Sequence, residues 1–166
     1  MRTPILKDAI CVARELVAPK DVENMLRLNE MFVGPSVDAK QFTRFQAELG
    51  LQVLIASPIS DLTKVHGYLW YHDADYAGQL VTQIARVFVH PSIQRCHNGF
   101  KLVTKLSELR GCRDMLGAAV DVSNEEGYMF FSSIGFAPSV EDSAAESEFL
   151  VRSKQWNPFP FEGFKT

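Results

Sequence analysis

Residues 79–122 constrain the fold more than any other stretch of this sequence. An apolar run, QLVTQIARVFV (79–89), leads into a polar turn, an amphipathic helix over about 98–110 and a second apolar run, MLGAAVDV (115–122). We expect two strands joined through a helix. Such a connection needs a right-handed crossover and places the two strands in parallel. The chain is therefore expected to contain a parallel pair inside an α/β sheet.

The strands before this unit follow one another without an intervening helix. LQVLIAS (51–57) and VHGYLWYH (65–72) read as strands, and the second forms an antiparallel hairpin with 79–89 through a polar turn around residues 73–78. The other predicted elements are a strand at 9–17, helices at about 19–32 and 38–48, a short helix at 124–134 and a last strand at 149–153. The order β-α-α-β-β-β-α-β-α-β predicts a mixed sheet flanked by helices. A doubly wound sheet is excluded because the middle strands are consecutive.

The composition indicates one globular domain. The chain has 166 residues, 46% of them hydrophobic and 22% charged, and this length suffices for a single core without disulfides. The net charge of −3 excludes the broad basic surface of a nucleic-acid-binding protein. No leader-like segment or long apolar run is present, so we expect a cytoplasmic protein that contacts no membrane.

The cysteines and histidines predict neither a disulfide nor a metal site. Three cysteines are an odd number without CxxC spacing and are interpreted as free thiols in a reducing compartment. The four histidines show no pairing at ligand spacing. The stretch His72 to Asp75 comes nearest to a metal-binding pattern, and we interpret it as a polar turn.

The polar turn between the strand 79–89 and the following helix has two interpretations. It is either a simple connector or an anion-binding turn. The N–H groups at the start of a helix point outward and attract phosphate, Gly99 permits close approach of the backbone, and Arg95 adds a cation. The turn alone does not decide between these alternatives.

A second pattern downstream supports the anion-binding alternative. In NEEGYMFFSSIGF (124–136), an asparagine begins a short helix that carries aromatic residues and ends at Gly135-Phe136.

Together the two segments resemble the GNAT superfamily of N-acetyltransferases. The first follows the family's V-x-P, Gln/Arg-x-x-G-x-G/A pattern through Val89, Pro91, Gln94 and Gly99. The second follows Asn-x-x-Ala, an aromatic pair and Gly-Phe through Asn124, Phe130, Phe131, Gly135 and Phe136, with Gly127 where alanine is usual. The resemblance covers roughly residues 9–152.

The resemblance implies a GNAT-like fold with a mostly antiparallel sheet, and acetyl-CoA or another acyl-CoA as co-substrate. Main-chain groups of Val87, Phe88 and Val89 would pair with the pantetheine arm, and Asn124 and Phe131 would lie at its thiol end. The turn that would hold the diphosphate comprises Gln94, Arg95, Cys96, His97, Asn98, Gly99 and Phe100. No metal is implied.

Three positions depart from the family pattern. His97 stands where the first glycine of the turn is usual, Phe131 where a tyrosine often protonates the leaving thiolate, and Gln83 where one branch has a glutamate base. Tyr128 and Asp121 are the candidate replacements for the missing acid and base. The alternatives are a helix-face aromatic residue for Tyr128 and a turn-forming carboxylate for Asp121.

Two functions remain open at this stage. The first is an N-acetyltransferase acting on an unidentified amine, which could belong to a small molecule or to a protein. The second is a catalytically weak or inactive GNAT-fold protein that binds acyl-CoA or another protein. The acidic stretch 141–148 is either a solvated loop or an attractant for cationic amines, through Glu141, Asp142, Glu146 and Glu148.

Two aromatic regions are expected to serve as packing or contact surfaces. Tyr68, Trp70 and Tyr71 are expected in the core or in the wall of an acceptor pocket. The aromatic tail 154–166 is expected to cover the domain surface or to meet a second subunit in a homodimer.

Overall fold

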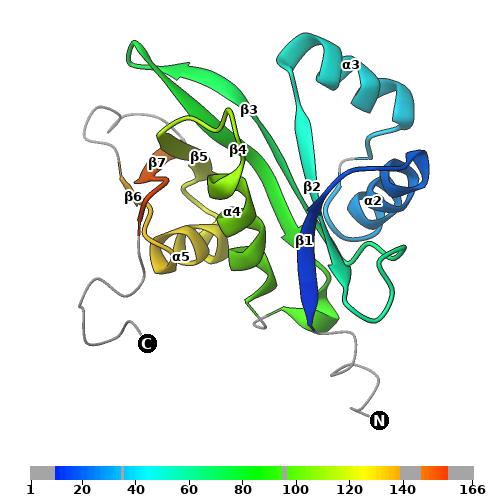
Figure 1. Cartoon of the computed structure of the whole chain (residues 1–166). Coiled ribbons are helices and arrows are strands. Elements are labelled where there is room, and N and C mark those ends of the chain that lie inside the picture. The colour runs from blue at the N-terminus through cyan, green and yellow to red at the C-terminus, as the bar shows by residue number, and fades with distance from the viewer. Residues whose placement is uncertain (1–9, 35, 95–96, 139–146, 157–166) are drawn as a thin grey trace. The chain divides into compact units, whose positions relative to one another are not determined.

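The computed structural model describes residues 10–34, 36–94, 97–138 and 147–156 (Figure 1). Its elements, in chain order, are β1 (Cys11–Glu15), α2 (Pro19–Phe32), α3 (Ala39–Leu49), β2 (Gln52–Pro58), β3 (Gly67–Tyr76), β4 (Gln79–Val89), the short 3₁₀ helix η1 (Pro91–Ile93), α4 (Asn98–Glu108), β5 (Met115–Asp121), α5 (Glu125–Ser133), β6 (Ala137–Pro138) and β7 (Ser147–Ser153). The predicted order of the principal elements is confirmed. η1 and β6 were not predicted.

The described strands form a mixed sheet in the order β1-β2-β3-β4-β5-β7-β6. The pairs β1–β2, β2–β3, β5–β7 and β6–β7 are antiparallel. β4 and β5 are parallel, with Thr82, Gln83 and Ile84 opposite Leu116, Gly117 and Ala118. The parallel pair expected from the strand–helix–strand pattern is therefore present.

The hairpin between β3 and β4 turns later than expected. Residues 73–75 belong to β3, which continues to Tyr76, so the prediction of a turn beginning at Asp73 was wrong. The turn is made by Ala77 and Gly78, which have φ values of 53° and 81°. Positive φ at both central residues is typical of tight two-residue hairpins. Asp75 supports the turn by accepting a hydrogen bond from the Gly78 N–H at 3.0 Å.

The chain divides into two compact units, and each is described separately. Unit 1 comprises residues 1–72 and 85–110, and unit 2 comprises residues 73–84 and 111–166. The prediction of a single domain with a C-terminal tail stays a prediction, and tail residues 157–166 lie outside the described residues.

The core of unit 1 lies between helices and β2, β3 and β4. Its buried residues include Met25, Leu26, Leu28, Phe42, Val53, Ile55, Tyr68 and Trp70. The prediction that Tyr68 and Trp70 are core residues is thus confirmed. Met31 follows the apolar spacing of α2 but is 65% exposed. α4 packs against β1 and β2 and buries Leu102, Val103 and Leu106 completely.

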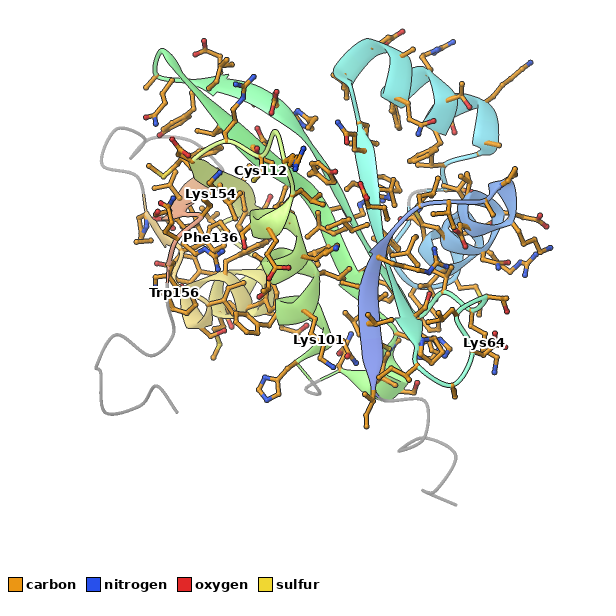
Figure 2. The ribbon with its side chains drawn as sticks, viewed as in Figure 1. Lys64, Lys101, Cys112, Phe136, Lys154 and Trp156 are labelled. Carbon is orange, nitrogen blue, oxygen red and sulfur yellow. The ribbon has the colours of Figure 1, made fainter. Side chains whose placement is uncertain are left out.

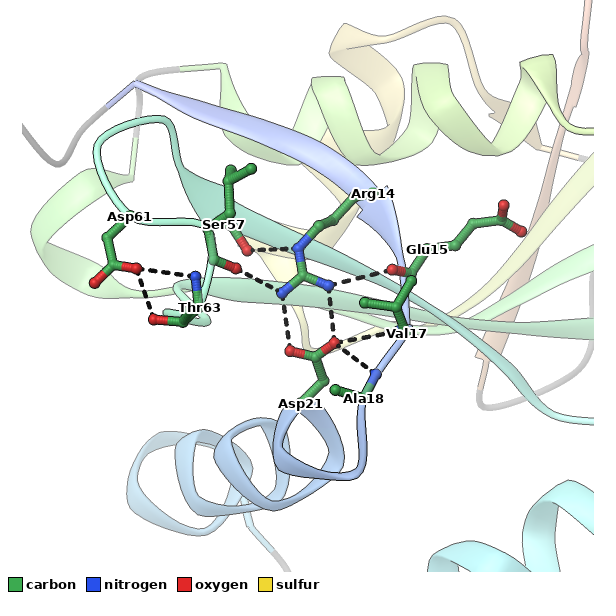
Figure 3. A network of polar contacts seen from close by, with 9 residues as sticks. Arg14, Glu15, Val17, Ala18, Asp21, Ser57, Asp61 and Thr63 are labelled. Carbon is green, nitrogen blue, oxygen red and sulfur yellow. Dashed lines mark hydrogen bonds and ion pairs between the residues drawn. The ribbon is translucent and has the colours of Figure 1, made fainter.

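An ion pair joins β1 to the start of α2 in unit 1 (Figure 3). The Arg14 guanidinium donates to both carboxylate oxygens of Asp21, at 2.8 and 2.9 Å, and to Ser57 Oγ at 3.0 Å. Asp21 also accepts hydrogen bonds from the N–H groups of Val17 and Ala18. Because Asp21 is only 4% exposed, this network is a buried polar connection between β1 and α2.

Unit 2 is organised by the long β5–β7 ladder, in which each strand contributes seven residues. The Phe149 ring covers Gly117, where a Cβ would lie 2.5 Å from the ring, and it stacks on Tyr76 with centroids 4.0 Å apart. Arg152 is buried and lies against Phe136 and Trp156, which appear near each other in Figure 2. Arg152 also donates to the Ile134 carbonyl at the end of α5.

The last two findings concern the cysteines and the length of the helices. Cys11 and Cys112 are free thiols, and Cys96 lies outside the described residues. None of the helices in the described part of the chain is both long and apolar enough to cross a membrane.

Candidate functional site

The segment between β4 and α4 in unit 1 folds back on the end of its own strand. The Gln94 side chain donates to the Val89 carbonyl at 2.9 Å, and the His90 Nδ1 accepts from the Ser92 N–H at 3.1 Å. Ile93 is buried and fixes η1 against the unit. The candidate cofactor residue Gln94 thus uses its side chain to close the turn. Arg95 and Cys96 lie outside the described residues.

His97 begins α4 in a left-handed conformation, with φ 61° and ψ 15°. This is the position at which the sequence pattern expects glycine, and glycine adopts this conformation without a steric penalty. The imidazole is exposed and does not cap the helix. His97 therefore keeps the backbone geometry of a glycine turn, with a ring added on the solvent side.

The first turn of α4 contains N–H groups that have no acceptor among the described residues. Within the described part of the chain, nothing accepts a hydrogen bond from the Gly99 or Phe100 N–H. Asn98 is buried, and its side chain donates to the Ile93 carbonyl at 3.3 Å. Lys101, labelled in Figure 2, donates to the Cys11 carbonyl at 3.0 Å and thereby ties α4 to β1. Exposed amides at the positive end of a helix are suited to hold an anion such as a diphosphate.

The candidate pantetheine-binding residues Val87, Phe88 and Val89 form the end of β4, and all three are half-buried. The described parallel pairs of β4 with β5 end at Ile84, and none of them includes these three residues. Side chains alternate along a strand, so Phe88 points to the opposite face from its two neighbours. It lies against Phe32 and Tyr68, with ring centroids 5.8 and 5.9 Å away.

In unit 2, the start of α5 is built by two side chains that follow β5. The Asp121 carboxylate accepts from the Ser123 N–H at 2.9 Å and from Ser123 Oγ at 2.6 Å, and these bonds hold the pKa of Asp121 below its usual value. Asn124 caps the helix by accepting from the Gly127 N–H at 3.0 Å. A Cβ at Gly127 would lie 2.6 Å from the Asn124 side chain, so the missing methyl leaves room for this cap.

The two candidate catalytic residues, Tyr128 and Asp121, line one cavity in unit 2. The cavity has a volume of about 360 Å³, and its lining comprises Val120, Asp121, Val122, Glu125, Tyr128, Met129 and Glu148. Glu148 is the described member of the acidic segment singled out in the sequence. Glu141, Asp142 and Glu146 lie outside the described residues. The sequence analysis proposed the two residues separately and did not predict that they share a cavity.

The positions of the usual acid and base are also in unit 2. Phe131 is buried among aromatic rings, with Phe130 and Phe136 at centroid distances of 5.1 and 5.0 Å. Gln83 is half-buried and lies opposite Gly117 in the parallel ladder. Neither side chain can donate or accept a proton at neutral pH. Within the described residues, no group of histidine, cysteine and acidic side chains is placed to bind a metal ion.

Sequence reasoning missed one polar group in unit 1. Arg86, in β4, donates to Asn29 Oδ1 of α2, and its guanidinium carbon lies 4.8 Å from the centre of the Trp70 ring. A basic residue inside an apolar strand was the available signal. Its partners come from distant parts of the sequence and could not be inferred from spacing.

Comparison with known proteins places this architecture among acetyltransferase structures. No model of a protein family and no curated protein sequence matches the chain. A protein from Desulfovibrio desulfuricans described as a GNAT-family acetyltransferase superposes with a TM-score of 0.66 at 18% identity, covering 87% of this chain and 99% of its own. Ard1 from Thermoplasma volcanium gives 0.64 at 18% identity, covering 86% and 97%. The PaiA N-acetyltransferase of Thermoplasma acidophilum, in complex with coenzyme A, gives 0.63 at 15% identity, covering 87% and 99%. The chain has the GNAT fold, as the resemblance predicted.

Proposed function

We propose that this chain is an N-acetyltransferase that transfers an acetyl group from acetyl-CoA to an amine. The observation that carries the proposal is the turn at the start of α4. There, His97 keeps a left-handed backbone, and the N–H groups of Gly99 and Phe100 have no acceptor among the described residues. The GNAT fold and the acetyltransferases that share it support the same activity.

The proposed cofactor contacts follow from the geometry of each segment. The diphosphate would accept hydrogen bonds from the α4 amides, where the helix dipole favours negative charge. The pantetheine arm would pair with main-chain groups of Val87 to Val89, which lie beyond the described pairs with β5. Asn124 and Phe131 are proposed to contact the thiol end, as the sequence resemblance implies.

The transfer itself needs a neutral amine and a proton for the leaving thiolate. The amine nitrogen attacks the thioester carbon, a C–N bond forms, the C–S bond breaks, and the proton released by the amine balances the CoA thiolate. We assign the proton donor to Tyr128, which lines the unit 2 cavity. Asp121, the candidate base, is poorly suited to take a proton from the amine. Its hydrogen bonds with Ser123 stabilise the carboxylate and lower its pKa.

A second function is favoured by the side chains that replace the usual acid and base. With Phe131 buried in an aromatic cluster and Gln83 in the sheet, the chain could bind acyl-CoA without transferring the acyl group. In that case it would act as an acyl-CoA-binding or protein-interaction module. The two functions share the cofactor site and differ in whether CoA is released when amines are added.

The proposal is tested by Gly99→Glu, which adds bulk and negative charge where the diphosphate would lie. We expect loss of CoA binding in calorimetric titration, with the folded state retained because an acidic residue in the first turn suits a helix. Thr104→Glu adds the same charge five residues further along α4 and should bind CoA normally. Unchanged affinity in Gly99→Glu would show that the turn is not the cofactor site. Release of CoA with a panel of amines then separates transferase from binding protein.

A further inference from the structure

Arg86 places a positive charge among neutral groups in unit 1. Its guanidinium donates to Asn29 Oδ1 and lies 4.8 Å from the centre of the Trp70 ring. Tyr68 donates its hydroxyl to the same Asn29 oxygen at 2.7 Å. Burial raises the pKa of Tyr68 to about 12, although the charge and hydrogen bond of Arg86 act in the opposite direction. The phenol is therefore neutral at neutral pH and does not balance the cation.

No carboxylate in the described part of the chain forms an ion pair with Arg86. This distinguishes it from Arg14 in the same unit, whose guanidinium is held by both oxygens of Asp21. An arginine remains charged at any physiological pH and carries five N–H donors in a planar fork. Arg86 is half-buried, and Asn29 Oδ1 accepts a hydrogen bond from one of its five N–H donors.

The position of Arg86 in β4 relates it to the proposed reaction. Arg86 directly precedes Val87, the first residue whose main chain is assigned to the pantetheine arm. Alternation along the strand places Arg86 and Phe88 on the face opposite to Val87. On that face Phe88 stacks with Phe32, which is 42% exposed. The face thus offers a cation for an anionic group and aromatic carbon for an apolar one.

We propose that Arg86 binds the carboxylate of the acceptor, which makes the acceptor an α-amino acid or a similar amine that carries a carboxylate. This inference rests on the proposed function. The guanidinium fork matches the two oxygens of a carboxylate. A single carbon separates the carboxylate of an α-amino acid from its amine, so a carboxylate held at Arg86 leaves the amine close to β4. Phe32 and Phe88 favour an apolar side chain.

A binding measurement tests this assignment without requiring turnover. The sequence has two tryptophans, so Trp156→Phe leaves Trp70, beneath Arg86, as the sole tryptophan. In that background, and in the presence of CoA, we expect L-leucine to change the fluorescence emission of Trp70 in a saturable manner. The affinity for L-leucinamide should be lower by roughly 10- to 100-fold. Arg86→Gln should remove the preference for leucine, and Arg86→Lys should retain part of it. Arg27→Gln, which removes an exposed arginine of α2, is the matched control. Equal responses to leucine and leucinamide, or no effect of Arg86→Gln, would overturn the assignment.

Steady-state rates separate failure of this inference from failure of the proposed function. The ratio of kcat/KM for leucine to that for leucinamide should fall by roughly 10- to 100-fold in Arg86→Gln. Comparing this ratio between wild type and variant cancels the different basicities of the two amines. If only cationic amines are turned over and Arg86→Gln leaves that rate unchanged, the proposed role of Arg86 is wrong and the transferase function still stands. Carboxylate-dependent Trp70 emission without any turnover would support the Arg86 site and reject the transferase.

Discussion

His97 adopts a backbone conformation that residues with a Cβ rarely occupy. Its φ of 61° is costly for any side chain, by about 1 kcal/mol. We therefore expect His97→Gly to stabilise the protein by roughly 0.5 kcal/mol in urea unfolding, because relief of strain exceeds the added entropy of the unfolded chain. Under the proposed function, CoA affinity should also rise once the exposed imidazole is removed.

Ala77→Gly provides the control for that experiment. Ala77 has a similar φ of 53° in the β3–β4 hairpin, outside the proposed cofactor turn. Its replacement should stabilise the fold to a comparable extent and leave CoA affinity unchanged. A rise in affinity in both variants would show that general stabilisation, and not the turn, controls binding.

Asp21 makes the stability of the protein dependent on acid pH. Its hydrogen bond with Arg14 is the main cause of a pKa below the usual value, and main-chain donors and the Arg14 charge act in the same direction against burial. The carboxylate therefore stabilises the folded state at a pH above its unfolded pKa, about 4. This contribution is lost as the pH falls through the lower pKa of the folded state.

Asp21→Asn should accordingly destabilise the protein by about 3 kcal/mol at pH 7, since it leaves Arg14 without its partner. The difference from wild type should shrink as the pH is lowered below 4, as measured by urea unfolding at several pH values. Asp61→Asn removes an exposed carboxylate that also has a lowered pKa and should have a smaller effect. A constant difference between Asp21→Asn and wild type down to pH 2 would contradict the assignment.

At the scale of elements, β5 depends on a residue without a side chain. Gly117 lies under the Phe149 ring, and a Cβ would come within 2.5 Å of that ring. We expect Gly117→Val to cost more than about 2 kcal/mol, because the ring must leave its stack with Tyr76. Ala119→Val, at an exposed position of the same strand, should be nearly neutral. Equal unfolding midpoints for the two variants would show that the ring moves without cost.

The elements that could be predicted are those with a strong local pattern. β4 was predicted with both its ends, and α2, α3 and α4 within two residues, since apolar periodicity and Pro19 are local signals. β6 has only two residues, and the end of β3 carries acidic side chains that resemble a turn. The strand–turn–helix segment from β4 to α4 could be predicted because its pattern is contiguous, and its assignment to a cofactor stays a prediction. Arg86 could not, since α2 and β3 supply its partners.

At the scale of the whole chain, neither compact unit is a continuous piece of sequence. Residues 73–84 belong to unit 2, although unit 1 supplies the chain on both sides of them. β3 and β4 therefore contribute residues to both units. Truncation at any single point removes strands from one unit or the other, so the tests above use the full chain.

The pH dependence of the acetyl-transfer rate is a property of the whole molecule. A positioned acid or base is worth roughly 10²- to 10⁴-fold in rate, and Gln83 and Phe131 supply neither at the usual positions. We expect slow acetyl transfer whose rate rises from pH 6 to 9 as the amine itself loses its proton. Gln83→Glu should raise the rate near neutral pH, and Gln83→Asn serves as its control. A fast wild type with a flat pH profile would contradict this expectation and direct mutagenesis to Tyr128 and Asp121.

The short strand β6 limits how this protein can aggregate. β6 is the outer strand beside β7, it has two residues, and one of them is Pro138, which has no N–H to offer. β6 itself offers a foreign strand few donors and acceptors, although it pairs with only Leu150 and Val151 of the seven residues of β7. At the other outer position, β1 has five residues and no proline. β1 is therefore the longer outer strand of the described sheet, and a charged substitution at the exposed Val12 would make it a poorer template for a foreign strand.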